Sequence, residues 1–561
     1  MINIKEKIEE FIKVALTELS LKGEIVLEHP GLLEHGDFSS NIAMALAKER
    51  KTSPFKLAEE IVSKIKKDDY IKKIEVVPPG FINFYLSNKF FAESLNSILK
   101  EAKDFGRSKE LVGQKIMIEY TDPNPFKEFH IGHLMSNSIG ESISRLIEWG
   151  GAEVKRACYQ GDVGMHVAKA IFGLLKLGLP SESATLREKV SALGKAYVLG
   201  AEEFERNHAE IDAINKKIYE KSDREINELY VKGRAWSLEY FEEIYKKLDT
   251  KFNFYFFESE SGGIGGEIVR KNIGKIFEES DGAIIFRGEN YGLHTRVFIN
   301  SFGLPTYEAK ELGLAKIKYD KYSYDTSIVI TGNEVNDYFK VLLQALTLVF
   351  PELAKKTRHI SHGMLRLPTG KMSSRKGEVV PAEDLFAVLE EAVNKKMGPE
   401  RFASAEEKKE IAEIVSIGAM KFSILKQSPG RDIIFDIQKA ISLEGDSGPY
   451  LQYTATRANS VLEKARAAGI LPKINEAKSG ELERCLYRFP EIIKTARENL
   501  SPQYVADYLL DLAQAFNNYY NQVMIIDDSN ESPYKVALAA AVAQVITNGL
   551  NILGIKVPKK M

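Results

Sequence analysis

Two histidines, His130 and His133, form the pattern in this chain that points most directly to chemistry. They follow a segment with Pro123 and Pro125, neither of which can continue a helix or a central strand. Gly132 lies between them, and without a Cβ it lets a nucleotide approach the backbone. A helix that begins at this turn would favour phosphate there through its free N–H groups and its dipole. The alternative is that both histidines make ordinary loop hydrogen bonds, because so short a motif is a weak signal alone.

A second cluster of charge lies far downstream in a polar loop. Lys371, Arg375 and Lys376 place three cations close together, just before Gly377. Cations on a loop suit a triphosphate whose negative charge moves onto a leaving pyrophosphate. The alternative is a solvated basic turn, which is the usual fate of such runs. The two stretches together predict an ATP site more specifically than either stretch does alone.

The residues around the histidines predict the elements that must position them. Residues 115–120 form an apolar run suited to a strand, and apolar residues mark one helical face over 131–149 before Gly150-Gly151. Residues 154–159 fit the next strand, which would complete a βαβ unit in a parallel sheet. Further strand candidates are residues 252–257, 284–286, 296–299 and 327–331.

The flanking regions predict further domains. Helices at 4–19, 42–49 and 54–65, with strands at 26–28, 74–77 and 81–86, predict an N-terminal α+β domain. Residues 186–251 are rich in Glu, Lys, Ala and Tyr, which predicts helices inserted between two halves of the sheet. From residue 381 the sequence has a mostly helical pattern, with an apolar stripe over 505–519, and this predicts a helical bundle. The predicted domains are 1–108, 109–380 with its insertion at about 186–251, and 381–561.

Composition describes an ordinary soluble protein of about three to four domains. The chain has 561 residues, of which 44% are hydrophobic and 28% charged, and its net charge of −2 gives no global basic field. Binding of RNA would therefore use local patches. Cys158 and Cys485 are too far apart for a Cys-x-x-Cys zinc site, so we expect no structural metal and a reducing cytoplasm. Residues 1–20 do not resemble a signal peptide, and 536–553 predict a buried helix, so no membrane association is expected.

The paired stretches around His130 and Lys371 resemble the signatures of class I aminoacyl-tRNA synthetases. Nearly the whole chain resembles the arginyl-tRNA synthetase family. The stretches that carry this resemblance outside the two signatures are 36–41, 79–84, 445–453 and 553–561. The resemblance implies a Rossmann-like parallel-sheet catalytic domain with a helical insertion, an N-terminal α+β domain that contacts tRNA, and a C-terminal all-α anticodon-binding bundle.

The same resemblance implies a reaction. Arginine would be ligated to tRNA(Arg) through an arginyl-adenylate, with ATP and Mg²⁺ consumed as a complex and with pyrophosphate and AMP released. In the loop at Lys371, the usual second lysine of the family falls at Ser374, and Lys127 is expected to compensate for it. The implied catalytic residues are His130, His133, Lys127, Lys371 and Lys376. The implied ATP-binding residues are Pro123, Asn124, Gly132, His362, Gly363, Met364 and Ser373, although Met364 could instead fill the core.

An arginine pocket needs carboxylates, neutral acceptors and an aromatic lid, because the guanidinium is a planar cation with five donors. Glu119 and Asn124 flank the loop before the first histidine, and Tyr307 and Glu311 stand four residues apart on one side of a helical turn. The family has such residues at these places, with Asp more usual than Glu311. Glu311 could alternatively cap or solvate a helix.

Other parts of the resemblance concern the tRNA and a departure from the family. Tyr450, Tyr453 and Met561 are implied tRNA-binding residues, although a tyrosine pair would otherwise indicate core packing. The family commonly has Gln near Val335 and His near Tyr338, and this chain has neither. A monomer is expected.

Three other functions compete with this interpretation. One is a related nucleotidyltransferase that makes adenylates without tRNA, which the long helical C-terminal block argues against. The second is a catalytically silent tRNA-binding relative, which the intact His130, Gly132, His133 and Lys371 argue against. The third is a synthetase for another amino acid, which would leave Glu119 and Glu311 unexplained.

Overall fold

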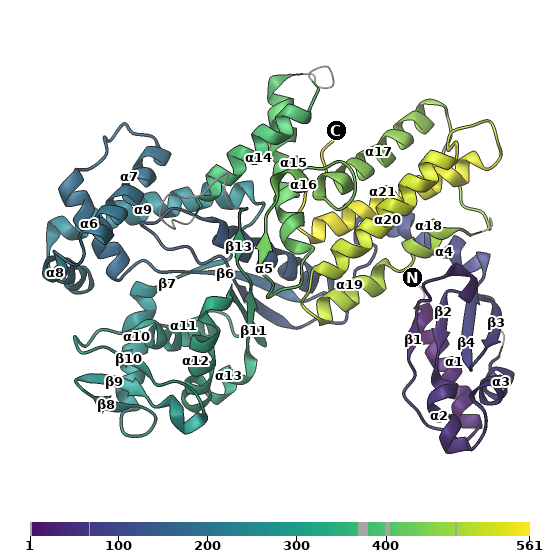
Figure 1. The fold of residues 1–561 in the computed structure, drawn as a ribbon, viewed down its shortest axis with the longest axis horizontal. Helices are drawn as coiled ribbons and strands as arrows, with labels where there is room; N and C mark the ends of the chain where they lie inside the picture. Colours follow the sequence, from purple (N-terminus) through teal and green to yellow (C-terminus); the bar gives the residue numbers. More distant parts are fainter. Residues whose placement is uncertain (1–2, 67, 369–379, 399–403, 477–478) are drawn as a thin grey trace. The chain divides into compact units, whose positions relative to one another are not determined.

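The computed structural model describes residues 3–66, 68–368, 380–398, 404–476 and 479–561 (Figure 1). The chain forms two compact units, and it passes between them more than once. The first unit consists of Met1–Gly106, Tyr453–Ile492 and Tyr508–Gly549. The second unit consists of Arg107–Gln452, Ile493–Asp507 and Leu550–Met561. The last residues of the chain therefore belong to the same unit as the two histidines.

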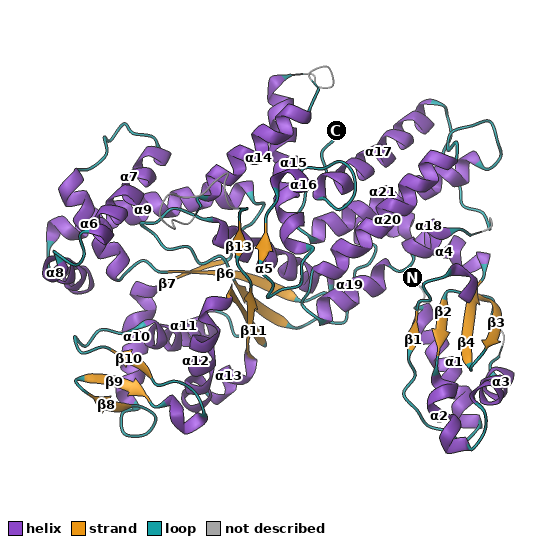
Figure 2. Ribbon diagram, in the orientation of Figure 1, coloured by secondary structure: helices purple, strands orange, loops and turns teal. Residues whose placement is uncertain are grey.

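The N-terminal part of the first unit is an antiparallel sheet with helices (Figure 2). Its strand order is β1-β2-β4-β3, and apolar side chains of the sheet and helices share one buried core. The strands are β1 (Leu27–Glu28), β2 (Phe38–Ser40), β3 (Ile71–Val77) and β4 (Phe81–Leu86). The helices are α1 (Ile4–Glu18), α2 (Ile42–Arg50), α3 (Pro54–Lys64) and α4 (Asn88–Glu101). The predicted α+β fold of this part is confirmed.

Helices make up the C-terminal part of the chain, as predicted. They are α17 (Gly448–Ala467), α18 (Glu481–Leu486), α19 (Phe489–Glu498), α20 (Gln503–Gln522) and α21 (Ser532–Ile552). Among the described residues, α21 is the one helix long and apolar enough to cross a membrane. However, 72% of its most apolar window is buried inside the protein, which is typical of a core helix.

The second unit is built on a five-stranded parallel sheet with the order β12-β11-β5-β6-β7. Its strands are β5 (Lys115–Glu119), β6 (Glu153–Gln160), β7 (Phe254–Phe257), β11 (Thr326–Gly332) and β12 (Thr357–His362). The first strand in sequence, β5, therefore lies at the centre of the sheet. The predicted βαβ unit and parallel sheet are confirmed.

Helix α5 (Ile131–Trp149) connects β5 to β6 and is buried along almost its whole length. A Cβ added to Gly140 would lie 2.2 Å from the Tyr120 ring, so glycine is needed for the helix to pack this closely. Since the helix begins directly after His130, both histidines lie on its first turn.

Four helices after β6 share a separate apolar core, which includes Phe126. They are α6 (Met165–Leu177), α7 (Leu186–Glu202), α8 (His208–Glu220) and α9 (Arg224–Lys247). The predicted helical insertion is thus present between β6 and β7, and α6 belongs to the same core.

The remaining elements complete the second unit. They are α10 (Glu258–Lys271), β8 (Glu278–Ser280), β9 (Ala283–Phe286), β10 (Arg296–Ile299), α11 (Tyr307–Lys321), α12 (Asn336–Val349), α13 (Pro351–Lys356), β13 (Leu365–Arg366), α14 (Ala382–Lys396), α15 (Ala405–Leu425), β14 (Ile433–Ile434) and α16 (Ile437–Ala440). Two predicted strands, 284–286 and 296–299, lie in a separate antiparallel sheet with the order β10-β9-β8. Edge strand β12 was not predicted, because Thr357–His362 lacks an apolar run.

Candidate active site

The first turn of α5 is capped by the two histidines themselves. His130 is the N-cap residue, and its Nδ1 accepts the N–H of Gly132 at 3.1 Å. His133 Nδ1 accepts the N–H of His130 at 3.2 Å, and the two rings stack with centroids 3.6 Å apart. Each imidazole thus satisfies one backbone donor at the helix start. The alternative interpretation, that the histidines make ordinary loop hydrogen bonds, therefore holds for the two Nδ1 atoms. It assigns no role to the two Nε2 atoms.

The protonation state of both rings follows from their surroundings. Burial, and to a lesser degree the Lys127 ammonium, lowers the pKa of His130 to about 4. Burial, His130 and Lys127 together hold the pKa of His133 well below its usual value. Both rings are therefore neutral near pH 7. Because Nδ1 accepts a hydrogen bond in each ring, the single proton lies on Nε2, which is a donor suited to an anion.

The loop that joins β5 to α5 has an unusual backbone. Thr121 and Asp122 have φ angles of +80° and +47°, in a region that residues with side chains rarely adopt. The Thr121 N–H donates to Ser136 Oγ at 2.9 Å, and the Tyr159 N–H donates to Asp122 Oδ1 at 2.7 Å. The loop is therefore held by bonds to both α5 and β6.

Asn124 follows buried Pro123 in the same loop and lies against the residue just after β6. A Cβ added to Gly161 would come within 2.3 Å of Asn124 Oδ1 and 3.2 Å of Glu258 Oε1. Gly161 is therefore needed for Asn124 to lie there. The predicted residue Asn124 is brought close to the acidic residues described next.

Two buried ion pairs lie beside this loop. Lys318 Nζ from α11 lies 2.9 Å from Oε2 of Glu119, the last residue of β5. Lys310 Nζ, also from α11, lies 2.6 Å from Oε2 of Glu258 at the start of α10. All four side chains are at most 5% exposed. Each pair satisfies a charge that would be costly to bury alone.

Two further acids in this cluster, Asp122 and Glu311, have no ion pair among the described residues. Burial, and next the Glu119 carboxylate, holds the pKa of both acids well above its usual value. Lys318 opposes this effect at both acids without cancelling it. The cluster is thus short of positive charge, and a cationic ligand would relieve the deficit.

Lys127 and Tyr307, two further predicted site residues, lie beside different parts of the site. Lys127 Nζ lies 4.6 Å from the centroid of the Tyr197 ring on α7, and its charge reaches both histidines. Tyr307, the first residue of α11, is 59% exposed, and Lys310 Nζ lies 5.2 Å from its ring centroid. Lys127 therefore belongs with the histidines, whereas Tyr307 belongs with the acidic cluster.

The predicted adenine site lies at the end of β12. His362 is buried, and its Nδ1 makes a hydrogen bond of 2.7 Å with Gly363 O. A Cβ added to Gly363 would lie 2.2 Å from the carbonyl group of Arg431, so this position requires glycine. Met364 is 41% exposed and therefore does not fill the core.

Three predicted phosphate ligands lie outside the described residues: Lys371, Ser373 and Lys376. The chain that follows them is anchored on the histidine turn. The Ile131 N–H donates to Val380 O at 3.1 Å, and the Ala382 N–H donates to Phe129 O at 2.8 Å. The described chain thus resumes directly beside His130.

The three predicted tRNA-binding residues have different surroundings. The Tyr450 N–H donates to Ser447 Oγ at 3.1 Å, near the start of α17. Tyr453 accepts a hydrogen bond of 3.1 Å from Arg457, whose guanidinium lies 4.7 Å from the Tyr453 ring centroid. Met561 lines an apolar pocket of the second unit. Tyr450 and Met561 belong to the second unit and Tyr453 to the first.

Several polar residues of this region were not predicted from the sequence. Five of them are buried, namely Asp162, His166, Glu258, Lys310 and Lys318, and Asp122 is half-buried. A signal existed for Lys318, which stands four residues after buried Leu314 and therefore on the same helical face. Asp162 is the second residue after β6, and its carboxylate accepts hydrogen bonds from Tyr230 and Arg234 on α9. Asp162 thus ties the insertion to the sheet.

The histidine turn and the acidic cluster lie where the strand order of the parallel sheet changes direction. The chain continues from β5 to β6 on one side, whereas β11 lies on the other side of β5. In open α/β sheets, ligands bind outside the carboxyl ends of the strands at such a point. The histidine turn follows β5, and the acidic cluster surrounds the end of the same strand.

Comparisons with known proteins agree with this geometry. A family model described as the catalytic domain of class I (R) tRNA synthetases matches residues 94–437. This chain belongs to the arginyl-tRNA synthetase family. The family's N-terminal domain matches residues 3–86, and the DALR anticodon binding domain matches 451–561. The resemblance described from the sequence is therefore confirmed.

Members of the arginyl-tRNA synthetase family match this chain along nearly its whole length. The arginine–tRNA ligase of Clostridium acetobutylicum is 31% identical over 550 residues, which cover 96% of each chain. That of Treponema denticola is 30% identical over 558 residues, covering 95% of this chain and 94% of the relative. The Thermus thermophilus arginyl-tRNA synthetase structure has a TM-score of 0.80 at 23% identity, over 99% of this chain and all of that one. That structural likeness shows the fold.

Proposed function

We propose that this chain activates arginine with ATP at the carboxyl end of β5 and then transfers it to tRNA(Arg). Membership of the family identifies the chain as a class I arginine–tRNA ligase, an enzyme that uses ATP. The assignment of residues to substrates is our own. The observation that carries it is the pair of acids without a paired lysine, Glu311 and Asp122, around the end of the strand that leads to two neutral histidine donors at a helix N-terminus.

The acidic cluster is proposed to bind the guanidinium of arginine. Glu311 and Asp122 carry carboxylates without a paired cation, and Glu119 lies close to both. A guanidinium offers five donors in a plane and forms bidentate bonds with carboxylates. Asn124 is proposed to contribute a neutral acceptor or donor, and Tyr307 to cover the pocket from its exposed position. Arginine thus brings the charge that the cluster lacks.

The turn at His130 is proposed to bind the phosphates of Mg²⁺-bound ATP. His130 and His133 each offer an Nε2–H, and the dipole of α5 favours an anion at this turn, where Gly132 adds no Cβ. Lys127 adds a cation close to both rings. Lys371, Ser373 and Lys376, which lie outside the described residues, are proposed to contact the phosphates as well. His362, Gly363 and Met364 are proposed to hold the adenine, and Pro123 to shape the loop beneath it.

The chemistry then needs positioning and charge stabilisation more than covalent catalysis. An oxygen of the arginine carboxylate attacks the α-phosphorus of ATP, and the bond from this phosphorus to the bridging oxygen breaks as pyrophosphate leaves. The Nε2–H groups and lysines stabilise charge that develops on the phosphates. The terminal 2′-hydroxyl of the tRNA then attacks the carbonyl carbon of the adenylate, and AMP leaves. Tyr450, Tyr453 and Met561 are proposed to contact the tRNA, and the enzyme is proposed to act as a cytoplasmic monomer.

The decisive experiment is pyrophosphate exchange with each amino acid, with and without tRNA. Exchange specific for arginine supports the proposal, whereas exchange with another amino acid contradicts it. Glu311→Gln should raise the KM for arginine by at least about tenfold, because a charge-assisted hydrogen bond contributes about 1.5 to 3 kcal/mol. Its KM for ATP should stay close to that of the native enzyme.

A control on the same helix separates the pocket from general effects of charge removal. Asp320 is an exposed acid of α11 that pairs with Lys316 at 2.6 Å. Asp320→Asn should leave both KM values unchanged. If Glu311→Gln behaves like Asp320→Asn, then Glu311 does not contact arginine and the proposed pocket is wrong.

A further inference from the structure

The C-terminal segment, residues 550–561, is fixed to the turn between α9 and β7. Lys421 Nζ on α15 donates to Leu248 O at 2.6 Å and to Gly554 O at 2.9 Å. Lys556 Nζ lies 2.9 Å from Asp249 Oδ1. All these residues belong to the second unit. The turn Leu248–Thr250 and the C-terminal segment are therefore held together by two lysines, one of them fully buried.

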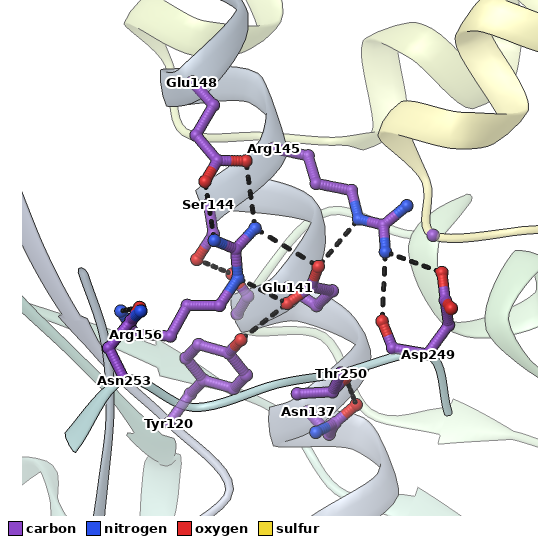
Figure 3. A network of polar contacts seen from close by, with 12 residues as sticks. Tyr120, Asn137, Glu141, Ser144, Arg145, Glu148, Arg156, Asp249, Thr250 and Asn253 are labelled. Carbon is purple, nitrogen blue, oxygen red and sulfur yellow. Dashed lines mark hydrogen bonds and ion pairs between the residues drawn. The ribbon is translucent and has the colours of Figure 1, made fainter. Parts of the chain in front are cut away.

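Helix α5 contacts the same turn through Arg145 (Figure 3). Arg145 Nη2 donates to Asp249 O at 3.1 Å and Oδ2 at 3.0 Å, and its Nη1 donates to Asn551 O at 2.9 Å. Its Nε donates to Glu141 Oε1 at 2.7 Å, and Glu141 Oε2 accepts the Tyr120 hydroxyl at 2.6 Å. One arginine thus joins α5, the turn and the C-terminal segment.

Thr250, the last residue of the turn, is connected to the loop after β5 through the side chain of Asn137. Thr250 Oγ1 donates to Asn137 Oδ1 at 3.0 Å, as Figure 3 shows. Asn137 Nδ2 in turn donates to Thr121 Oγ1 at 3.0 Å. Thr250, Asn137 and Thr121 are all buried, so water does not replace a lost bond at low cost. A continuous series of bonds therefore runs from the C-terminal segment to Thr121.

Thr121 is the point at which this support matters most. It begins the loop that carries Asp122 and Asn124, and its φ of +80° is unfavourable for a threonine. A residue persists in such a conformation only when surrounding bonds hold it there. Two bonds hold it directly, namely its N–H to Ser136 Oγ and the Asn137 amide to its Oγ1. Loss of either bond favours relaxation of the loop.

We propose that the Leu248–Thr250 turn is a positioning element for the Thr121–Asn124 loop and that the C-terminal segment holds this turn in place. Asn137 bonds the loop directly and Thr250 acts through Asn137, and neither is proposed to contact the reacting atoms, so both are positioning residues. Lys556 acts one step further away, through Asp249. This inference rests on the proposed function, since Asn124 is the substrate-binding residue that the loop presents.

Two conservative variants test the two ends of this series. Thr250→Val keeps the shape of the buried side chain and removes its hydrogen bond to Asn137. Lys556→Met keeps the aliphatic stem and removes the ion pair with Asp249. Each variant should lower kcat for arginine-dependent pyrophosphate exchange in the presence of tRNA(Arg), Thr250→Val by between about fivefold and a hundredfold and Lys556→Met by less. The KM for tRNA should not change.

The measurement must separate positioning from loss of folded protein. Rates are therefore expressed per active site, counted by active-site titration, and thermal unfolding is recorded for each variant. The matched controls are Thr347→Val, which removes an exposed helical hydrogen bond to Leu343 O, and Lys217→Met, which removes an ion pair with Asp223 of the same length, 2.9 Å. Both controls should retain the native rate per active site.

The double variant Thr250→Val/Lys556→Met decides whether the two ends are coupled. If the turn transmits the effect, the double variant should be no slower than Thr250→Val alone within a factor of two, because the single change already disconnects the loop. Native rates in both single variants overturn the proposal, and so does a double variant whose loss equals the product of the single losses. If the native chain shows no exchange with arginine, the proposed function fails instead.

Discussion

His130 has two separable roles in this structure, because its two ring nitrogens face different partners. Its Nδ1 caps α5 by accepting the Gly132 N–H, whereas no described residue bonds its Nε2, which is proposed to contact a phosphate. Asparagine is among the best N-cap residues, since its side-chain oxygen accepts the same kind of bond, and alanine cannot cap at all. His130→Asn should therefore keep the helix start and remove the phosphate donor, while His130→Ala should remove both.

The expected magnitudes differ enough to be measured. Loss of an N-cap costs about 0.5 to 2 kcal/mol, so His130→Ala should unfold at a lower denaturant concentration than His130→Asn by about that amount. Loss of one donor to charge that develops in a transition state costs about 10²- to 10³-fold in rate. Both variants should therefore lose activity about equally, although only the alanine variant loses the cap.

Pyrophosphate exchange and denaturant unfolding of the three proteins test this separation. Exchange should be reported as kcat and as KM for ATP, with unfolding followed at pH 7.5, where His130 is neutral. An asparagine variant that keeps activity within tenfold of the native enzyme would limit His130 to capping. An asparagine variant as unstable as the alanine variant would show that Nδ1 does not cap α5 as described.

Three further predictions concern other charged groups. Lys318→Met should destabilise the protein by about 3 to 5 kcal/mol in denaturant unfolding, because it leaves Glu119 buried without a cation, and adding Glu119→Gln should restore much of the loss. Lys127→Ala should raise the pKa of His130 above about 4, as seen by NMR titration, and slow adenylate formation; an unchanged rate would remove Lys127 from the site. Glu491, held by His29 and Lys5, has its pKa lowered to about 2, so the stability it contributes is present above about pH 4.5 and is lost as pH falls towards 2. Glu491→Gln should flatten the acid limb of that stability curve, and a curve like that of the native protein would refute the assignment.

The elements that position the histidines could be predicted because they have a strong periodic pattern. Strand β5 and helix α5 are apolar in the right periods, and the prolines of the loop between them exclude a continuous element. Strand β12 could not be predicted in this way. Its sequence, Thr357–His362, contains one aliphatic residue, and it is a strand only because it pairs with β11 at the edge of the sheet.

The candidate site shows the same division between local and long-range information. Glu119 and Asn124 were predicted from their places beside the first histidine, and Glu311 from its spacing to Tyr307 and its match to the family, but Lys310 and Lys318 were not predicted. A lysine on a helix is normally read as solvated, and nothing local shows that Lys318 reaches Glu119 two hundred residues earlier in the chain. The tautomer of His130 could not be predicted from the sequence either, because it depends on which ring nitrogen accepts a hydrogen bond from the backbone.

The shifted pKa values of Glu311, Asp122 and His130 lead to a last prediction: the affinities for arginine and for ATP should depend on pH in opposite directions. Burial holds the pKa of Glu311 and Asp122 well above the usual value, and a bound guanidinium would favour their ionised forms. Arginine should therefore release protons when it binds, and its affinity should rise with pH while these acids are still partly protonated. The phosphates of ATP act on His130 in the opposite sense, since an anion raises its pKa from about 4 and makes binding tighter as pH falls. Calorimetry in two buffers of different ionisation enthalpy measures both proton counts, and arginine binding without proton release would show that the acids are already ionised in the free enzyme.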